Sequence, residues 1–438
     1  MGSSERLRTV ELGGRVGERA RVMGWLHSRR AMGGITFLVV RDGWGLAQVV
    51  AEGAAPLTSL AEAGAGVESV IAVEGIIAAS AQAPGGCELR EPRIEVIAAV
   101  ASPPPVALNK RQLNAALGTL LTSAVVSNRH PARRATLRLG SGIMRGFRAA
   151  LGERHFTEVQ TPKIVAAATE SGANVFRLDY FGRPAFLAQS PQFYKQIMVG
   201  VYERVFEVGP VFRAEPHDTT RHINEYVSLD AEMGFIEDHF TVMALLREVI
   251  ASMMAALHEQ HASDLRLTGT ALPGVPTVIP HLHFAEAQEL ILRRHGVDVR
   301  GEPDLSPQDE RWLGDWARAE HGSEWLFVTG YPMRKRPFYT HPDPARPEYS
   351  NSFDLLFRGV ELATGGQRRH LYADYVAALA AAGLPLAPFA SYLDAFRYGM
   401  PPHGGFAIGL ERFVTQLVGL PSVKLATTFP RDLHRLEP

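Results

Sequence analysis

The chain has 438 residues, 46% of them hydrophobic, which is enough to bury a sizeable core and suggests two domains. Its 45 basic and 46 acidic residues nearly cancel, so any attraction to nucleic acid must come from local patches. The single cysteine, Cys87, excludes an internal disulfide framework and a cysteine-rich zinc site. We see no apolar run long enough to span a membrane and no apolar signal core, and we expect a cytoplasmic protein.

The first hundred residues read as a small antiparallel barrel. Five apolar segments separated by Gly-rich and Asp-rich turns favour an OB fold. Over residues 1–41 eight arginines face only three glutamates. This basic charge, interleaved with Trp25 and Phe37, offers a stacking surface for unpaired bases. The alternative is that Phe37 belongs to the barrel core.

A stiff proline stretch, SPPPV, follows the barrel at 102–106 and marks a boundary. We place an OB-fold domain at 1–101, a hinge at 102–134 and a second domain at 135–438. The second domain begins with a helix that carries an apolar stripe of Met144, Phe147 and Leu151.

The segment 212–232 reads as two strands joined by a polar loop. Arg213 and Glu215 stand two residues apart, so on a strand they share one face. Polar side chains repeat this spacing on the return strand: Tyr226, Ser228, Asp230 and Glu232. The loop carries Arg221 and His222, which suits binding of an anionic ligand. The alternative is a solvated hairpin with ordinary surface charges.

The segment 352–366 predicts a second hairpin, with its turn at Arg358-Gly359. In that register residue 356 faces Glu361, so Asp354 and Glu361 lie on one face, roughly 7–8 Å apart at Cα. Two such carboxylates suit a Mg²⁺ ion that also holds substrate phosphates.

A glycine-rich strand passes into a helix at 404–412. Glycines allow close approach to a ligand, and Arg412 falls in the first helical turn, where free N–H groups favour anions. Such a turn by itself is weak evidence for a ligand site, because an arginine there is more often a surface charge.

Taken in this order, the segments resemble those of a class II aminoacyl-tRNA synthetase, with Pro162 in motif 1, residues 212–215 as motif 2 and residues 409–412 as motif 3. Four further segments narrow the likeness to the aspartyl branch in its compact archaeal-like form: TESGAN, QSPQFYKQ, FRYGMPPHGG and FPRDLHRLEP. The resemblance covers nearly the whole chain. It implies an α+β protein with an N-terminal OB-fold barrel and a class II catalytic domain, an antiparallel sheet flanked by helices.

The resemblance also implies a nucleotide site for ATP and Mg²⁺. Three residues are implied as catalytic: Arg213, Glu361 and Arg412. The implied ATP-binding residues are Arg213, Glu215, Arg221, His222, Tyr226, Glu361, Gly409 and Arg412. The implied metal ligands are Asp354, Glu361 and Thr364, with threonine where the family usually has serine. Motif 1 implies a homodimer.

The resemblance implies an L-aspartate site beside the nucleotide site. The residues that it implies there are Glu170, Ser171, Gln192, Lys195, Asp230, Tyr339, Thr364 and Arg368. Relatives that charge asparagine lack the lysine, so Lys195 with Arg368 points to aspartate. We expect both cations to be buried without compensating charges, which would reject a neutral amide.

The anticodon residues implied by the likeness are Arg30, Phe37, Gln48 and Glu88. Relatives that reject tRNA(Asn) tend to carry tryptophan at the position of His27 and lysine at that of Pro84. We therefore expect both tRNA(Asp) and tRNA(Asn) to be charged with aspartate, with a tRNA-dependent amidotransferase as an implied partner. Alternatively, His27 is an ordinary surface residue.

Residues 260–325 read as a helical insertion, with Ser306 capping one helix and Gly296 ending another. His281 and His283 lack the further ligands that a metal site needs. Other functions stay open: a discriminating aspartyl enzyme, an asparaginyl enzyme, or a non-catalytic RNA-binding regulator descended from a synthetase. Lys195 disfavours the second and the intact motifs disfavour the third.

Overall fold

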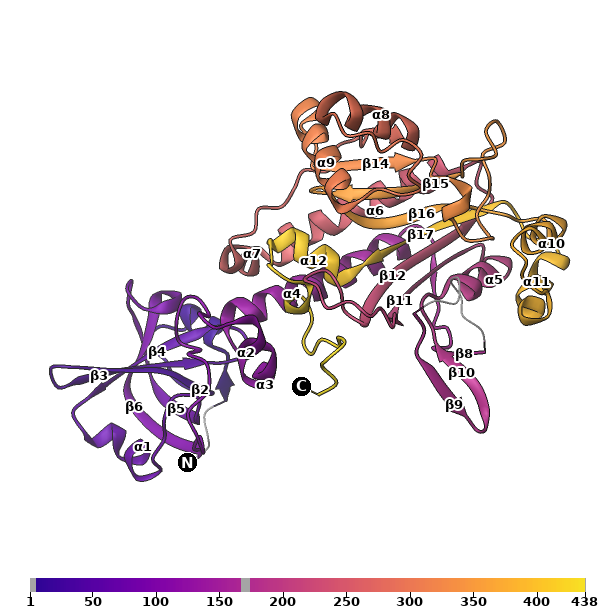
Figure 1. Ribbon diagram of the computed structural model, residues 1–438. Coiled ribbons are helices and arrows are strands. Elements are labelled where there is room, and N and C mark those ends of the chain that lie inside the picture. Colours follow the sequence, from indigo (N-terminus) through magenta and orange to yellow (C-terminus); the bar gives the residue numbers. More distant parts are fainter. Residues whose placement is uncertain (1–4, 167–173, 438) are drawn as a thin grey trace. The chain divides into compact units, whose positions relative to one another are not determined.

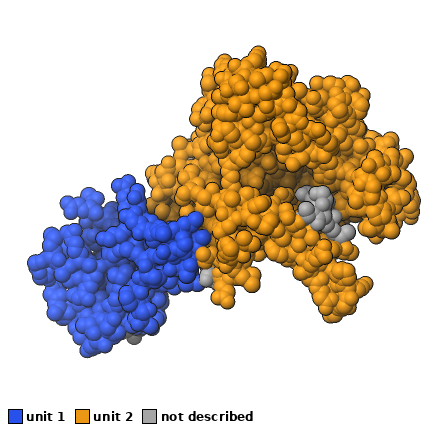
Figure 2. All heavy atoms as spheres, viewed as in Figure 1, with its two compact units in different colours: residues 1–130 blue, residues 131–438 orange. Residues whose placement is uncertain are grey.

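A computed structural model describes residues 5–166 and 174–437 and divides into two compact units, residues 1–130 and 131–438 (Figure 2). We call these the N-terminal unit and the C-terminal unit. The predicted aspartate ligands Glu170 and Ser171 lie outside the described residues.

The N-terminal unit is a closed barrel (Figure 1). Its strands run in the order β1-β2-β3-β4-β6-β5, and β2 pairs again with β5 to close it. The strands are β1 (Arg6–Leu7), β2 (Arg19–Met32), β3 (Ile35–Arg41), β4 (Leu46–Glu52), β5 (Val70–Ala79) and β6 (Cys87–Ala98). Five of these match the five predicted segments. The expectation of a wholly antiparallel barrel is wrong, because β4 pairs with β6, and β1 with β2, in parallel.

Buried and partly exposed side chains alternate along these strands, and the buried ones form the barrel core. Val22, Leu38, Val40 and Val49 are fully buried, while the residues between them on each strand are partly exposed. Short helices complete the unit: η1 (Thr9–Gly14), η2 (Ala55–Leu57), α1 (Thr58–Glu62), η3 (Pro84–Gly86), α2 (Leu117–Thr122) and α3 (Ala124–Ser127).

The C-terminal unit is built on an eight-stranded sheet in the order β13-β14-β15-β16-β17-β12-β11-β7 (Figure 1). Its strands are β7 (Thr157–Glu158), β11 (Arg204–Phe212), β12 (Glu225–Gly234), β13 (His281–His283), β14 (Trp325–Thr329), β15 (Ser352–Phe357), β16 (Val360–Arg368) and β17 (His403–Gly409). The six central strands are antiparallel, as predicted, and the two edge strands are parallel to their neighbours. A separate small sheet contains β8 (Ile164–Val165), β9 (Arg177–Tyr180) and β10 (Arg183–Leu187).

One face of the large sheet is covered by α4 (Pro131–Gly152), α6 (His239–Gln260), α7 (Ala262–Thr268) and α12 (Leu410–Val418). The predicted stripe of α4 packs there: Phe147 and Leu151 are fully buried, and Met144 lies against the same cluster. This face holds the main core.

The helix α6 corrects one expectation. It is long and apolar enough to cross a membrane by length and composition, whereas the sequence analysis found no such run. Half of its apolar stretch is buried, and it packs against α4 and the sheet. We therefore assign it to the core of the C-terminal unit.

The opposite face carries two smaller clusters. One lies under α8 (Phe284–His295) and α9 (Pro307–His321), the other under α5 (Gln192–Tyr202), α10 (Tyr372–Ala381) and α11 (Ala390–Arg397). Short 3-10 helices are η4 (Met333–Lys335), η5 (Ala387–Phe389) and η6 (Val423–Leu425). The predicted caps are confirmed, since Ser306 accepts a hydrogen bond at the start of α9 and Gly296 ends α8 in the left-handed conformation.

The helix α9 approaches the β15–β16 turn very closely. A Cβ atom added to Gly314 would lie 2.5 Å from the Cα of Gly359. Because both atoms nearest to it are backbone, the contact tolerates no side chain.

We expect Gly314→Ala to push α9 away from this turn and to lower the free energy of unfolding by about 1–3 kcal/mol. Chemical denaturation would measure the change. Gly152→Ala, at a helical glycine with open space around it, serves as the control and should be neutral or stabilising. A Gly314→Ala protein as stable as the control would contradict the close contact.

Candidate active site

The first predicted hairpin forms in the expected place, with Phe212 paired to Glu225. The prediction that Arg213 and Glu215 lie on the first strand is wrong, because β11 ends at Phe212. The physical reason is Asn224, whose side-chain amide donates to the carbonyls of Arg213 and Glu215, at 2.7 and 3.2 Å. These two residues therefore begin the loop.

This loop still brings the predicted nucleotide residues together. Arg213 lies 3.9 Å from a carboxylate oxygen of Glu215, and its guanidinium stands over the ring of Tyr226. The Nε2 atom of His222 lies 3.4 Å from the other oxygen of Glu215. An adenine ring and a phosphate group would meet an aromatic face and cationic side chains here.

The second hairpin has the predicted turn register, with Leu356 opposite Glu361 and Phe357 opposite Val360. A bulge between Leu355 and Leu356 shifts the pairing beyond them, so that Asp354 lies opposite Thr364.

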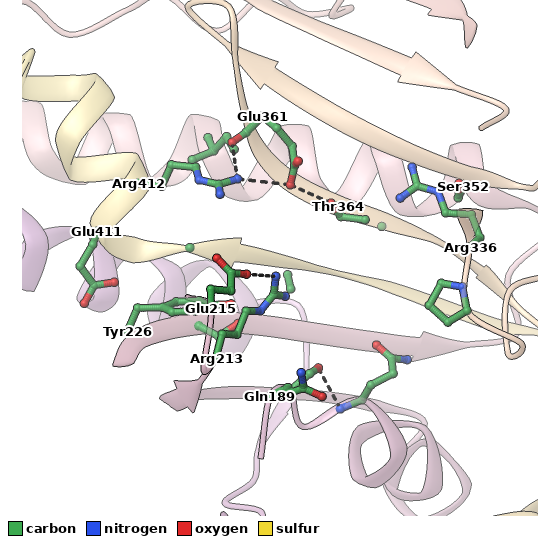
Figure 3. Close-up of a pocket in the computed structure, with 18 of the residues that line it drawn as sticks. Gln189, Arg213, Glu215, Tyr226, Arg336, Ser352, Glu361, Thr364, Glu411 and Arg412 are labelled. Carbon is green, nitrogen blue, oxygen red and sulfur yellow. Dashed lines mark hydrogen bonds and ion pairs between the residues drawn. The ribbon is translucent and has the colours of Figure 1, made fainter. Parts of the chain in front are cut away.

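Around Glu361, strand β16 meets helices α12 and α9, and Figure 3 shows Glu361 with Thr364 and Arg412. Its carboxylate accepts hydrogen bonds from Thr364, at 3.1 Å, and from Arg412 of α12, at 3.3 Å. Its backbone N–H donates to Glu310 of α9, at 3.1 Å. Burial, with Glu361 close by, raises the pKa of Glu310 to about 7. Sequence reasoning missed Glu310 because it belongs to a helix fifty residues away.

Asp354 does not face open space as a metal ligand would. Both its oxygens accept from the Nη2 atom of Arg336, at 3.0 and 3.1 Å, and its side chain is only 7% exposed. In the described structure Asp354 of the predicted Asp354–Glu361 magnesium pair is thus paired with Arg336, and the magnesium assignment stays a prediction. Burial raises the pKa of Asp354 to about 6, although Arg336 opposes the shift.

The two hairpins and helix α12 border a cavity of about 460 Å³. The predicted site residues that line it are Gln192, Lys195, Arg213, Glu215, Arg221, His222, Tyr226, Tyr339, Glu361, Thr364, Arg368, Gly409 and Arg412. Asp230 and Asp354 lie behind this lining. Residues that sequence reasoning missed include Gln189, Ser190, Lys335, Arg336, Ser352 and Glu411. In Figure 2 the C-terminal unit is visibly hollowed.

Glu411, next to the predicted Arg412, is buried and connects two elements of the site. Its carboxylate accepts from the backbone N–H of Val227, at 3.1 Å, and burial raises its pKa to about 7. It joins the motif 3 helix to the β12 strand.

The other end of the cavity contains a buried charge cluster. Lys195 lies 3.0 Å from Asp230 and 3.2 Å from Glu232, and Arg368 donates to Glu232 at 2.9 Å. Each of these side chains is 8% exposed or less. The expectation that Lys195 and Arg368 lack compensating charges is therefore wrong, because two carboxylates balance them. Glu232, seen only as part of a polar alternation, was not predicted as a site residue.

In the N-terminal unit, the four predicted anticodon residues lie on neighbouring strands of the barrel, and Glu88 among them is only 5% exposed. Arg30 pairs across strands with Phe37, and Gln48 pairs with Glu88. The Gln48 amide donates to Glu88 at 2.9 Å. Phe37 is partly exposed and lies outside the barrel core cluster. An aromatic ring beside amide, carboxylate and guanidinium groups suits stacking and base-edge readout of unpaired RNA.

The two predicted specificity positions differ in exposure. Pro84 is half-buried in the η3 turn. His27 is 8% exposed and lies at the bulge of β2, where its Nδ1 atom is 3.0 Å from Arg41. Arg41 in turn forms a buried ion pair with Glu68, at 2.7 Å. The reading of His27 as an ordinary surface residue is therefore wrong.

Two family models match this chain. One, described as tRNA synthetases class II (D, K and N), covers residues 117–433, and the other, an OB-fold nucleic acid binding domain, covers residues 20–97. The chain belongs to the class II tRNA synthetases of this group. The predicted fold class, an OB-fold domain with a class II catalytic domain, is thereby confirmed.

Similar class II synthetases match along the whole chain. The aspartate–tRNA(Asp/Asn) ligases of Thermus thermophilus and Deinococcus radiodurans are 46% and 44% identical, covering 98% and 99% of this chain and 99% of each relative. Among solved structures, Pyrococcus horikoshii asparaginyl-tRNA synthetase with asparaginyl-adenylate has a TM-score of 0.91 at 30% identity, covering 99% of this chain and all of that one. Entamoeba histolytica aspartyl tRNA synthetase has a TM-score of 0.85 at 25% identity, covering 99% of this chain and 93% of that one.

A buried histidine beside the charge cluster gives this synthetase a pH dependence. His403 is fully buried, donates from Nδ1 to the carbonyl of Pro401 at 2.9 Å and accepts from Gln196 at 2.9 Å. Burial lowers its pKa to about 4. Because the unfolded chain then binds a proton that the folded chain excludes, the contribution of His403 to stability falls as the pH drops from about 6.5 to about 4.

We expect His403→Gln to weaken the pH dependence of the free energy of unfolding. The change in this free energy between pH 6.5 and 4 should be smaller by up to about 3 kcal/mol. Unfolding at a series of pH values, with each variant compared to the wild type, would measure it. His258→Gln, on the exposed side of α6, is the control and should leave the slope unchanged. An unchanged slope in His403→Gln would show that His403 titrates normally.

Proposed function

We propose that this chain is an aspartate–tRNA ligase that forms aspartyl-adenylate from aspartate and ATP and transfers the aspartate to tRNA(Asp) and tRNA(Asn). One observation carries the proposal. A single cavity has the Arg213–Arg412 cations at one end and the Lys195–Arg368 pair at the other. The names of the two relatives from Thermus thermophilus and Deinococcus radiodurans support the choice of both tRNAs.

The chemistry requires charge stabilisation and positioning more than proton transfer. An α-carboxylate is ionised at neutral pH, so it attacks the α-phosphate of ATP in line without a general base. We assign Arg213 to the α-phosphate and Arg221, His222 and Arg412 to the departing pyrophosphate. Glu215 would hydrogen-bond adenine, which stacks on Tyr226, and Gly409 lets the backbone approach the nucleotide.

Mg²⁺ is a proposed cofactor of this site. The Glu361 carboxylate and the Thr364 hydroxyl are 3.1 Å apart on the cavity wall, which suits an oxygen-loving cation. Asp354 fits as a third ligand only if Arg336 releases it. The ion, when bound, would neutralise charge on the β- and γ-phosphates. Among the described residues no group of three or more His, Cys, Asp or Glu could hold a metal, and we propose that phosphate and water oxygens complete the site.

The amino-acid end would select aspartate through its donors. Lys195, which lines the cavity, can donate to a substrate carboxylate while keeping Asp230 as its partner. Arg368 donates weakly to Gln192, at 3.4 Å, and this donor is available to the same carboxylate. Asparagine would place its amide NH₂ against these donors, which leaves them unpaired. Tyr339 and Thr364 border this end, and Glu170, Ser171 and Asp230 are proposed for the α-amino side.

The remaining assignments rest on the family. We propose that residues 1–101 read the anticodon through Arg30, Phe37, Gln48 and Glu88, that residues 102–134 form the hinge and that residues 135–438, with an insertion at 260–325, form the catalytic domain. The proposal also includes a homodimer through the Pro162 segment and a cytoplasmic location. Its further partner is a tRNA-dependent amidotransferase that converts Asp-tRNA(Asn).

Aspartate-dependent ATP–pyrophosphate exchange tests the first step. We expect exchange with aspartate and none with asparagine, and a loss of about 100-fold in Lys195→Met, because a donor to the substrate carboxylate disappears. Lys195→Arg, which keeps the charge, should lose less. An asparaginyl enzyme would prefer asparagine, and a regulator would show no exchange with either amino acid.

Charging of tRNA(Asp) and tRNA(Asn) transcripts with labelled aspartate tests the choice of tRNA. We expect comparable charging of both. Pro84→Lys combined with His27→Trp should lower charging of tRNA(Asn) about tenfold relative to tRNA(Asp), the size of one base-specific contact.

Two controls accompany the charging experiment. Gln82→Lys adds the same charge at an exposed position of the same turn and should change nothing. Charging of tRNA(Asp) near the wild-type rate shows that the barrel of each variant is folded, which is needed because His27 is buried against Arg41. If the wild-type protein charges tRNA(Asp) but not tRNA(Asn), the assignment as an aspartate–tRNA ligase is kept and the amidotransferase is removed from the proposal.

A further inference from the structure

Arg336 stands where the cation of the proposed metal site would be needed. Its Nη2 atom reaches both oxygens of Asp354, and its positive charge also acts on Glu361. It follows the short helix η4 and lines the cavity. Arg336 thus neutralises the buried carboxylate of Asp354, which was predicted as a metal ligand from the hairpin register.

The carboxylate of Asp354 has little capacity left for another ligand. Besides Arg336 it has a hydrogen bond with the hydroxyl of Tyr331, a residue that is 2% exposed. The Arg336 guanidinium packs over the Tyr331 ring at 4.1 Å, which fixes its plane beside the carboxylate. A divalent ion that binds the same oxygens would be repelled by this guanidinium, so the Arg336–Asp354 pair disfavours a metal at Asp354.

Arg336 also has a donor to spare. Its Nε atom is buried and has no hydrogen-bond partner within residues 5–166 and 174–437. A buried N–H without a partner is costly, so a group that offers an acceptor there would be favoured. The oxygens of a nucleotide phosphate in the cavity are such acceptors, and arginine binds them well.

We propose that Arg336 is a competing cation that keeps divalent metal off Asp354 until nucleotide phosphate draws the guanidinium away. The metal ion and the nucleotide then bind with positive coupling, because the nucleotide offers Arg336 a new partner. This inference rests on the proposed function and concerns a positioning residue, not a group that takes part in bond making.

Binding of Mn²⁺ to the protein, followed by electron paramagnetic resonance without and with a non-hydrolysable ATP analogue, tests the proposal. The wild type should bind Mn²⁺ weakly alone and more tightly with the analogue. Arg336→Gln should bind Mn²⁺ alone at least about 5-fold more tightly than the wild type and show less coupling to the analogue. The measurement is made at pH 8.5, because losing Arg336 raises the pKa of Asp354 further.

Three variants control this experiment. Arg336→Lys keeps the charge and should stay close to the wild type. Arg334→Gln removes an exposed arginine two residues away and should not change Mn²⁺ binding. Adding Asp354→Asn to Arg336→Gln should abolish the gain, since the freed carboxylate is then absent.

Equal Mn²⁺ affinity of Arg336→Gln and the wild type, with unchanged coupling, would overturn the proposal. A gain that survives in the Arg336→Gln, Asp354→Asn double variant would overturn it as well, because the metal would then not use Asp354. Aspartate-dependent pyrophosphate exchange by the wild type is measured in parallel. Its absence would reject the proposed function, whereas its presence with an unchanged Mn²⁺ affinity would reject only the role of Arg336.

Discussion

The catalytic unit depends on one buried charge cluster. Lys195, Asp230, Glu232 and Arg368 come from α5, β12 and β16, and each is almost completely removed from water. Isolated charges at such depth would cost several kcal/mol each, so the four must remain together. The cluster therefore ties helix α5 to the sheet and fixes the end of the cavity where we place the amino acid.

The opposite end of the cavity is organised differently. The side chains of Arg213, Glu361 and Arg412 are each about 40% exposed, and their ion pairs are 3.3–3.9 Å long. Contacts of this kind in water contribute little to stability and are easily exchanged. A ligand with several negative charges can replace them at low cost. The site thus combines a rigid pocket for a small substrate with an adaptable surface for a large anion.

Local patterns in the sequence predicted much of this structure. The Arg358-Gly359 turn defined the hairpin register next to it, and Ser306 and Gly296 marked helix ends, because turns and caps depend on neighbouring residues. The alternation along 226–232 correctly indicated one polar face. The four predicted anticodon positions came from the family resemblance, and the strand pairing of the barrel places them on neighbouring strands.

Contacts between distant segments were not predictable in this way. The amide of Asn224 ends the β11 strand early, and the bulge beside Leu355 moves Asp354 opposite Thr364. Arg336 reaches Asp354 from a loop, and no spacing rule connects the two residues. The compensation of Lys195 and Arg368 by carboxylates depends on the packing of α5, β12 and β16, which are distant in the sequence.

The backbone contact between Gly314 and Gly359 has a consequence for protein engineering. Helix α9 is joined through this contact, and through Glu310, to the turn that leads to Glu361. A chimera that exchanges this helix between relatives must therefore exchange the 358–361 turn as well, or a side chain at either glycine position will separate the helix from the sheet. The two segments form a single module although they are distant in the chain.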